Sequence, residues 1–301
     1  MAALGCGSFM LPSPLLAQPA KGDVPKAAPK GDAPKGTPKG APTRPDAPKP
    51  DAAPKPIPKR KLASLEPSIA AIAGDNAEEA AKAAEALGGD PTPPAHEALL
   101  DALALGLPAP VAVTAFNALV QHPAPPDVIA LKRYAGHHNP AVRSAAIGAL
   151  AMYPDPAAHA VVVAGLHDAT GAVRGAAAAA AAKGRVRDAV PALFQLLAKG
   201  EEPAARALAA LADADLARKV GDQLGQVPDA ALAICLGLIL KRADFGPDPA
   251  RVEVVRAIAK IADAAAVTAL TDYLDATPKN PPRPSRQEAE KVVEARLGGG
   301  K

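Results

Sequence analysis

Tryptophan is absent from this chain of 301 residues, and the other aromatic residues are scarce, with three tyrosines and four phenylalanines. The core must therefore be built from alanine, leucine, valine and isoleucine. Only two cysteines occur, Cys6 and Cys235, and the apolar run around Cys235 indicates a small buried side chain. Removal of a leader that contains Cys6 would leave no possible internal disulfide, so the fold does not depend on one.

Sequence motifs that carry chemistry are missing as well. The sequence has no glycine-rich phosphate loop, no nucleophile with a partnered base and no paired carboxylates in a plausible cleft. These absences predict that the protein is not an enzyme and that it uses no cofactor.

Charge is distributed unevenly along the chain. Residues 21–61 contain 11 basic and 4 acidic residues, whereas the remainder contains 23 basic and 27 acidic residues. Between Pro19 and Pro58 there are 12 prolines, set among lysine, alanine, glycine and aspartate. A segment of this composition cannot bury a core, so residues 21–62 are predicted to be a disordered linker. It could serve as a spacer, as an arm that binds a polyanion, or as a plain linker.

Residues 1–20 carry no charge and resemble the later part of a secretory signal, with a cut after Ala17 or Ala20. The segment Ala3-Leu4-Gly5-Cys6 also resembles a lipoprotein box, so lipidation of Cys6 is an alternative, as is an unprocessed N-terminus. The apolar run is too short and too interrupted for a transmembrane helix. We expect export to the periplasm or cell envelope, with the cytoplasm as the alternative.

A 31-residue period organises residues 63–301. Asn139-Pro140-Ala141-Val142-Arg143 opens one helical run, and Thr170-Gly171-Ala172-Val173-Arg174 opens the next, 31 residues later. A second apolar helix follows each of them after a short break. Positions at this spacing are aliphatic: Leu100, Leu131, Val162, Leu193 and Leu224 in the second helices, and Val111, Val142, Val173 and Ala204 in the first. One helix pair cannot cover its own apolar face, so the period predicts a stack of pairs.

The motif Asn139-Pro140-x-Val142-Arg143-x-x-Ala146, followed by Ala149-Leu150 and Asp155-Pro156, resembles the HEAT repeat, and most closely the bacterial phycobilisome-lyase-like kind. The resemblance extends from about Leu65 to Leu297. It implies an all-α fold, a right-handed superhelical solenoid of roughly seven helix pairs that ends in a polar cap helix. It also implies a binding scaffold whose second helices line the inner face.

The resemblance favours a partner-binding surface on the second helices. Candidate residues on these helices are Lys132, Arg133, Tyr134, Phe194 and Gln195. Arg143, Arg174 and Arg206 are spaced 31 and 32 residues apart, and such arginines in HEAT repeats pair with an acidic or amide residue of a neighbouring turn. We therefore interpret these three arginines as structural.

Metal binding is not indicated by the histidines. All six lie between His96 and His167, and no short-spaced ligand motif accompanies His137 and His138 in their turn. His96-Glu97 resembles the recurring pairs that hold two irons in the HEAT-repeat enzyme deoxyhypusine hydroxylase. The equivalents one and two periods later are Asp127-Val128 and Ala158-His159, which do not supply the ligands. His96 and Glu97 are therefore predicted to lie on the surface.

These observations predict a monomeric, non-enzymatic scaffold of the bacterial cell envelope that binds a protein partner. The alternative is a nucleic-acid or polyanion binder that acts through the lysine- and proline-rich tail. Binding through the tail would weaken steeply as the salt concentration rises.

Overall fold

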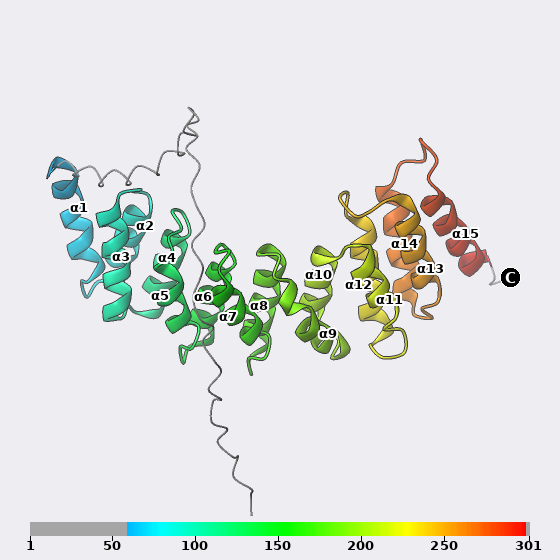
Figure 1. Cartoon of the computed structure of the whole chain (residues 1–301), viewed down its shortest axis with the longest axis horizontal. Helices are drawn as coiled ribbons and strands as arrows, with labels where there is room; N and C mark the ends of the chain where they lie inside the picture. Colours follow the sequence, from blue (N-terminus) through cyan, green and yellow to red (C-terminus); the bar gives the residue numbers. More distant parts are fainter. Residues whose placement is uncertain (1–58, 299–301) are drawn as a thin grey trace, which may run out of the picture. The chain divides into compact units, whose positions relative to one another are not determined.

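The computed structural model describes residues 59–298 of a chain that divides into two units, 1–54 and 55–301. The predicted leader and nearly all of the predicted linker lie outside the described residues. The described part contains fifteen α-helices, one short 3-10 helix and no β-sheet (Figure 1). The helices are α1 (Lys59–Ile72), α2 (Ala77–Gly88), α3 (Pro93–Leu105), α4 (Ala109–Leu119), α5 (Asp127–Tyr134), α6 (Pro140–Leu150), α7 (Pro156–Gly165), α8 (Gly171–Lys183), η1 (Arg187–Ala189), α9 (Val190–Ala198), α10 (Glu202–Leu211), α11 (Ala214–Gly221), α12 (Asp229–Lys241), α13 (Asp248–Ala259), α14 (Ala264–Ala276) and α15 (Pro284–Gly298).

Two layers of helices make up the described part. The even-numbered helices α2 to α14 pack in sequence against one another, and the odd-numbered helices pack on them as a second layer. This arrangement confirms the predicted α-solenoid of about seven helix pairs. Within residues 59–298, no helix is both long and apolar enough to cross a membrane.

Neighbouring helices lie closer together in the even layer than in the odd layer. Small residues cause this difference, because they let two backbones approach. A methyl group added to Gly88 of α2 would lie 2.5 Å from the Cβ of Ala118 in α4. The alanine run of α8 is likewise buried at Ala177, Ala178, Ala180 and Ala181. In the odd layer, α3, α5 and α7 are spaced more widely than α4, α6 and α8 of the even layer.

The 31-residue register is confirmed over the central repeats. Leu131, Val162 and Leu193 of the odd layer are fully buried, as are Val111, Val142, Val173 and Ala204 of the even layer. Two predicted positions depart from this pattern. Leu100 is only half-buried, and Leu224 is 37% exposed. The expected helix 214–224 ends early, at Gly221, so Leu224 lies in the turn after α11.

Helix starts follow the expected capping signals in the central repeats. The Asn139 side chain accepts a hydrogen bond from Ala141 N at 2.9 Å, and Asp155 accepts one from Ala157 N at 2.6 Å. At the C-terminal end, Asp248 at the start of α13 and Ser285 near the start of α15 form hydrogen bonds with each other. The Ser285 hydroxyl donates to Asp248 Oδ1 at 2.6 Å and lies 2.7 Å from the Tyr273 hydroxyl, which ties α13, α14 and α15 together.

The first described helix also differs from expectation. The predicted linker extends to residue 62, whereas α1 begins at Lys59 and contains Pro67 in its interior. At the opposite end, α15 follows the predicted cap helix, and its exposed residues include Gln287, Lys291 and Glu294.

Candidate functional site

Two equivalent arginines hold the turns between successive repeats. Arg143 donates to both carboxylate oxygens of Asp168 at 2.9 Å and to the carbonyl oxygens of His137 and His138. The hydrogen bonds from Arg143 lower the pKa of Asp168, so Asp168 remains ionised. Arg143 therefore joins two turns, the one that contains His137 and His138 and the one that contains Asp168. This confirms its structural role.

Arg174 repeats this arrangement one period later. It pairs with Glu201, at 2.7 Å between Nη2 and Oε1, and donates to the carbonyl oxygens of Asp168 and Ala169. Arg206 does not continue the series. It pairs with Glu202 of its own helix, and its side chain is exposed, because its spacing from Arg174 is 32 residues instead of 31.

A buried polar cluster links α3, the start of α5 and the turn after α6. The Asp127 carboxylate, which is fully buried, lies 2.6 Å from His96 Nε2 and accepts a hydrogen bond from the Tyr153 hydroxyl at 2.8 Å. It also accepts one from Ala124 N at 2.8 Å. Burial and the carboxylate of Asp127 raise the pKa of Tyr153, so its hydroxyl stays protonated as a donor.

This cluster corrects the surface assignment of His96, whereas Glu97 is exposed as expected. The sequence held a signal for the pair, because His96 and Asp127 occupy the same register position in adjacent repeats, 31 residues apart. Only 17% of the His96 side chain is exposed, and the Asp127 side chain is not exposed at all. The Asp127 carboxylate contacts His96, Tyr153 and the Ala124 backbone, all of the same chain. The cluster is therefore structural.

Lys132 and Arg133 lie exposed at the C-terminal end of α5. The Arg133 guanidinium donates to the Ala104 carbonyl oxygen of α3 at 3.1 Å. Tyr134 is not part of this surface. Its ring packs edge-on against Phe116 at 5.1 Å between centroids, and its hydroxyl donates to the Leu103 carbonyl oxygen at 2.8 Å.

The two candidates on α9 lie apart from those on α5. Phe194 is half-buried against the core, whereas Gln195 is exposed. Because α7 packs on α5 and on η1, which precedes α9, it lies between the two candidate groups. The structure thus brings Lys132 and Arg133 together and leaves Phe194 and Gln195 as a separate group.

A groove of about 640 Å³ runs between α5 and α7, with α6 beneath it. Its α7 wall consists of Ala157, Ala160, Val161, Ala164 and Gly165, and its α5 wall includes Lys132. The groove exists because the α7 wall carries only small side chains. Helix α7 lies close to its neighbours at Gly165, since a methyl group there would lie 2.8 Å from Ile147 Cδ1 and 3.0 Å from Ala177 Cβ. Sequence analysis found Lys132 but missed the groove.

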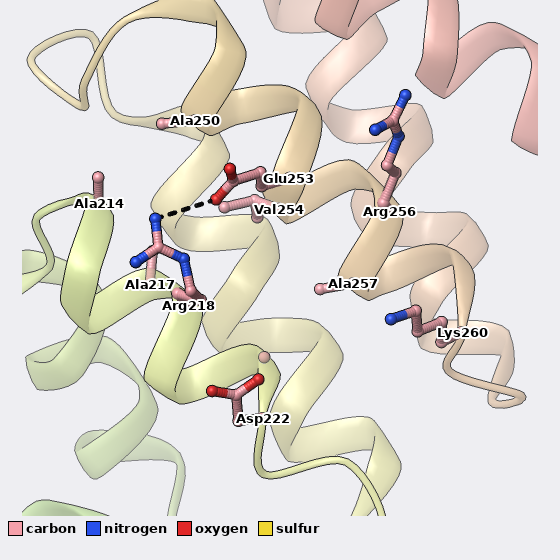
Figure 2. A pocket seen from close by; sticks show the side chains of 11 residues that line it. Ala214, Ala217, Arg218, Asp222, Ala250, Glu253, Val254, Arg256, Ala257 and Lys260 are labelled. Atoms are coloured by element: carbon pink, nitrogen blue, oxygen red, sulfur yellow. Dashed lines mark hydrogen bonds and ion pairs between the residues drawn. The ribbon is translucent and has the colours of Figure 1, made fainter.

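A second groove, of about 300 Å³, lies between α11 and α13 (Figure 2). Small residues such as Ala217 and Ala257 line it, and charged residues lie along its rim. Arg218 of α11 reaches across to Glu253 of α13 at 3.4 Å (Figure 2). Arg218 also pairs with Asp215 of its own helix, at 3.1 Å. Arg256 pairs with Glu288 at 3.1 Å. Most rim charges of this groove are therefore already paired within the protein.

Sites for metal or thiol chemistry are not evident in the part of the chain that the structure describes. No group of three or more histidine, cysteine, aspartate or glutamate side chains there could hold a metal ion. Cys235 is fully buried in α12, and burial raises the pKa of its thiol to about 12. Such a thiol stays protonated and unreactive.

Stacked helix pairs with arginine–carboxylate turns define this protein as a helical-repeat solenoid. A family model described as HEAT repeats matches residues 97–182, from α3 to most of α8. Among curated proteins, no sequence matches the chain.

Several solved structures are similar to this chain. One is the complex of CpcE and CpcF of phycocyanin lyase from Nostoc sp. PCC7120, with 19% identity and a TM-score of 0.43 over 84% of this chain and 99% of that chain. Kap121p has 15% identity and a TM-score of 0.44 over 79% of this chain and 30% of its own. Human deoxyhypusine hydroxylase in complex with glycerol has 20% identity and a TM-score of 0.37, over 80% of this chain and 98% of that chain. At these identities the likeness concerns the fold, and it assigns no activity or ligand to this chain.

Proposed function

We propose that this protein is a non-enzymatic, protein-binding scaffold of the bacterial cell envelope, whose odd layer of helices holds the partner. The observation that carries the proposal is the α5–α7 groove, with Lys132 at its rim and with exposed apolar side chains on the same layer of helices. Ile129 of α5 is 77% exposed and Leu105 of α3 is 83% exposed. Large apolar side chains that accompany an open groove are typical of a surface that a partner covers.

The binding test uses the natural partner, isolated with the full-length chain as bait and then purified. Replacing Lys132→Glu together with Arg133→Glu should weaken the complex tenfold or more, which is about 1.4 kcal/mol. The reason is that the change reverses two exposed charges on α5, one of which, Lys132, lines the groove. Isothermal titration calorimetry measures the affinity, and circular dichroism checks that the variant keeps its helices.

Deletion of residues 21–58, which ends before α1, is the matched control. The affinity should stay within about threefold, under 1 kcal/mol, because no aromatic residue in this segment can stack on a base and four aspartates dilute its charge. An essential tail with an unaffected double variant would instead favour the polyanion-binding function.

Export is the second part of the proposal, and it rests on the signal-like residues 1–20. The chain isolated from its source should begin near Gln18 or Lys21, because a leader peptidase cuts after small residues such as Ala17 and Ala20. Mass spectrometry of the purified protein measures its N-terminus. An intact Met1 on a chain in the soluble cytoplasmic fraction would contradict the envelope assignment.

A further inference from the structure

We infer that the occupant of the α5–α7 groove is an amphipathic helix with carboxylate side chains along one edge. This inference rests on the proposed function and adds the chemical class of the partner segment. Three features of the groove support it: the spacing of its small residues, the lack of charge on its α7 wall, and the unpaired Lys132 on its α5 rim.

The α7 wall has the periodicity of a helix surface that accepts another helix. Ala157, Ala160, Ala164 and the neighbouring Val161 and Gly165 follow the i, i+3, i+4, i+7, i+8 spacing, so they form one continuous stripe. Ala157, Ala160 and Ala164 are exposed, although they lie on a helix whose other side is buried. Large side chains of a partner helix fit into a stripe of small ones, as in ridges-into-grooves packing.

The two walls of the groove differ in charge. No residue of α7 is an acid, a lysine or an arginine, so this wall favours apolar side chains. Lys132 lies on the opposite rim, and within residues 64–298 it forms no ion pair with a carboxylate. Arg133 follows it on α5, and its guanidinium reaches the Ala104 carbonyl oxygen of α3 instead. Ile129 precedes them by about one turn on α5 and extends the apolar surface.

Asp168, the acidic residue that lines this groove, does not offset the basic rim. Both of its carboxylate oxygens accept hydrogen bonds from Arg143. These bonds lower the pKa of Asp168 and pair its negative charge with the guanidinium of Arg143. The α11–α13 groove differs here, because Arg218 and Arg256 of its rim have carboxylate partners. Lys132 of the α5–α7 groove therefore remains available to a partner carboxylate, and apolar residues of the same helix would face α7.

The probe is a synthetic, fluorescein-labelled helical peptide of about 16 residues, stapled because an isolated helix of this length is marginal in water. It carries leucines at i, i+4, i+7 and i+11 and glutamates along one adjacent edge. A second peptide replaces the glutamates by lysines, and a third replaces the leucines by alanines. Fluorescence anisotropy with the full-length chain should show binding of the glutamate peptide, at least tenfold weaker binding of each of the other two, and weakening at high salt.

Variants of the protein locate the binding. Ala160→Phe, which fills the groove from an exposed position, should weaken the glutamate peptide at least tenfold, as should Lys132→Glu with Arg133→Glu. Ala179→Phe places the same side chain at an exposed position of the even layer, and Lys260→Glu reverses a charge at the α11–α13 groove. Both of these control variants should bind the peptide as the unchanged chain does.

Several outcomes would overturn the inference. Equal binding of the glutamate and lysine peptides, or no binding of the glutamate peptide, would exclude this partner class. If the natural partner still responds to Ala160→Phe in that case, the scaffold function stands and only the class is wrong. A dimer in analytical ultracentrifugation that Ala160→Phe dissociates would assign the groove to a second copy of the chain. Insensitivity of the natural partner to both groove variants would remove the proposed function as well.

Discussion

Asp127→Ala should lower the free energy of unfolding by about 3–5 kcal/mol. The fully buried carboxylate accepts hydrogen bonds from His96 on α3, Tyr153 after α6 and the backbone N–H of Ala124. Its removal therefore leaves these three donors without their acceptor. Because these groups come from successive repeats, the change also loosens the packing between them. Urea unfolding followed by circular dichroism measures the loss.

Asp155→Ala provides the matched control, since it makes the same chemical change at a half-buried aspartate. It removes the N-cap of α7 and should lower stability by about 1 kcal/mol. Tyr153→Phe alone should lower stability by about 1–2 kcal/mol, and the double variant with Asp127→Ala by less than the sum. Equal effects of Asp127→Ala and Asp155→Ala would show that the cluster contributes nothing beyond a helix cap.

Leu131→Ala and Leu193→Ala should each lower the free energy of unfolding by about 2–5 kcal/mol. Both side chains are fully buried in the odd layer, two periods apart, and each truncation opens a cavity between helix pairs. Leu224→Ala makes the same change at the register position that the structure leaves 37% exposed, and its effect should stay within about 0.5 kcal/mol. Urea unfolding of the three variants compares them directly. Losses below half a kcal/mol at both buried positions would mean that the 31-residue register is wrong.

The fold could be predicted because its signals are local or repeat at a fixed distance. Asn139 and Asp155 mark helix starts through their own side chains, and the buried aliphatic positions recur every 31 residues. The prediction was wrong where long-range contacts replace local ones. Asp248 has the sequence of a cap, but its carboxylate binds Ser285, which is 37 residues away.

The candidate site could be predicted only in part. The exposure of Lys132 and Arg133 follows from their polar side chains on an amphipathic helix. Tyr134 looked equally accessible in sequence, yet its ring completes the packing against Phe116. The α5–α7 groove depends on the distance between two helices and on what is missing from α7, and neither has a signature in the residues of α5 alone.

The predominance of alanine in the buried core has a thermodynamic consequence. An alanine side chain has no rotamers to lose on folding, so each buried alanine opposes folding less than a leucine would. It also removes less apolar surface from water, and apolar surface exposed on unfolding is the main source of the heat-capacity increment. An array packed through methyl groups, such as those of Ala177, Ala180 and Ala181, therefore has a small heat capacity of unfolding for its length. Its stability consequently changes gently with temperature, which keeps the spacing of its repeats, and of the grooves between them, steady over a broad thermal range.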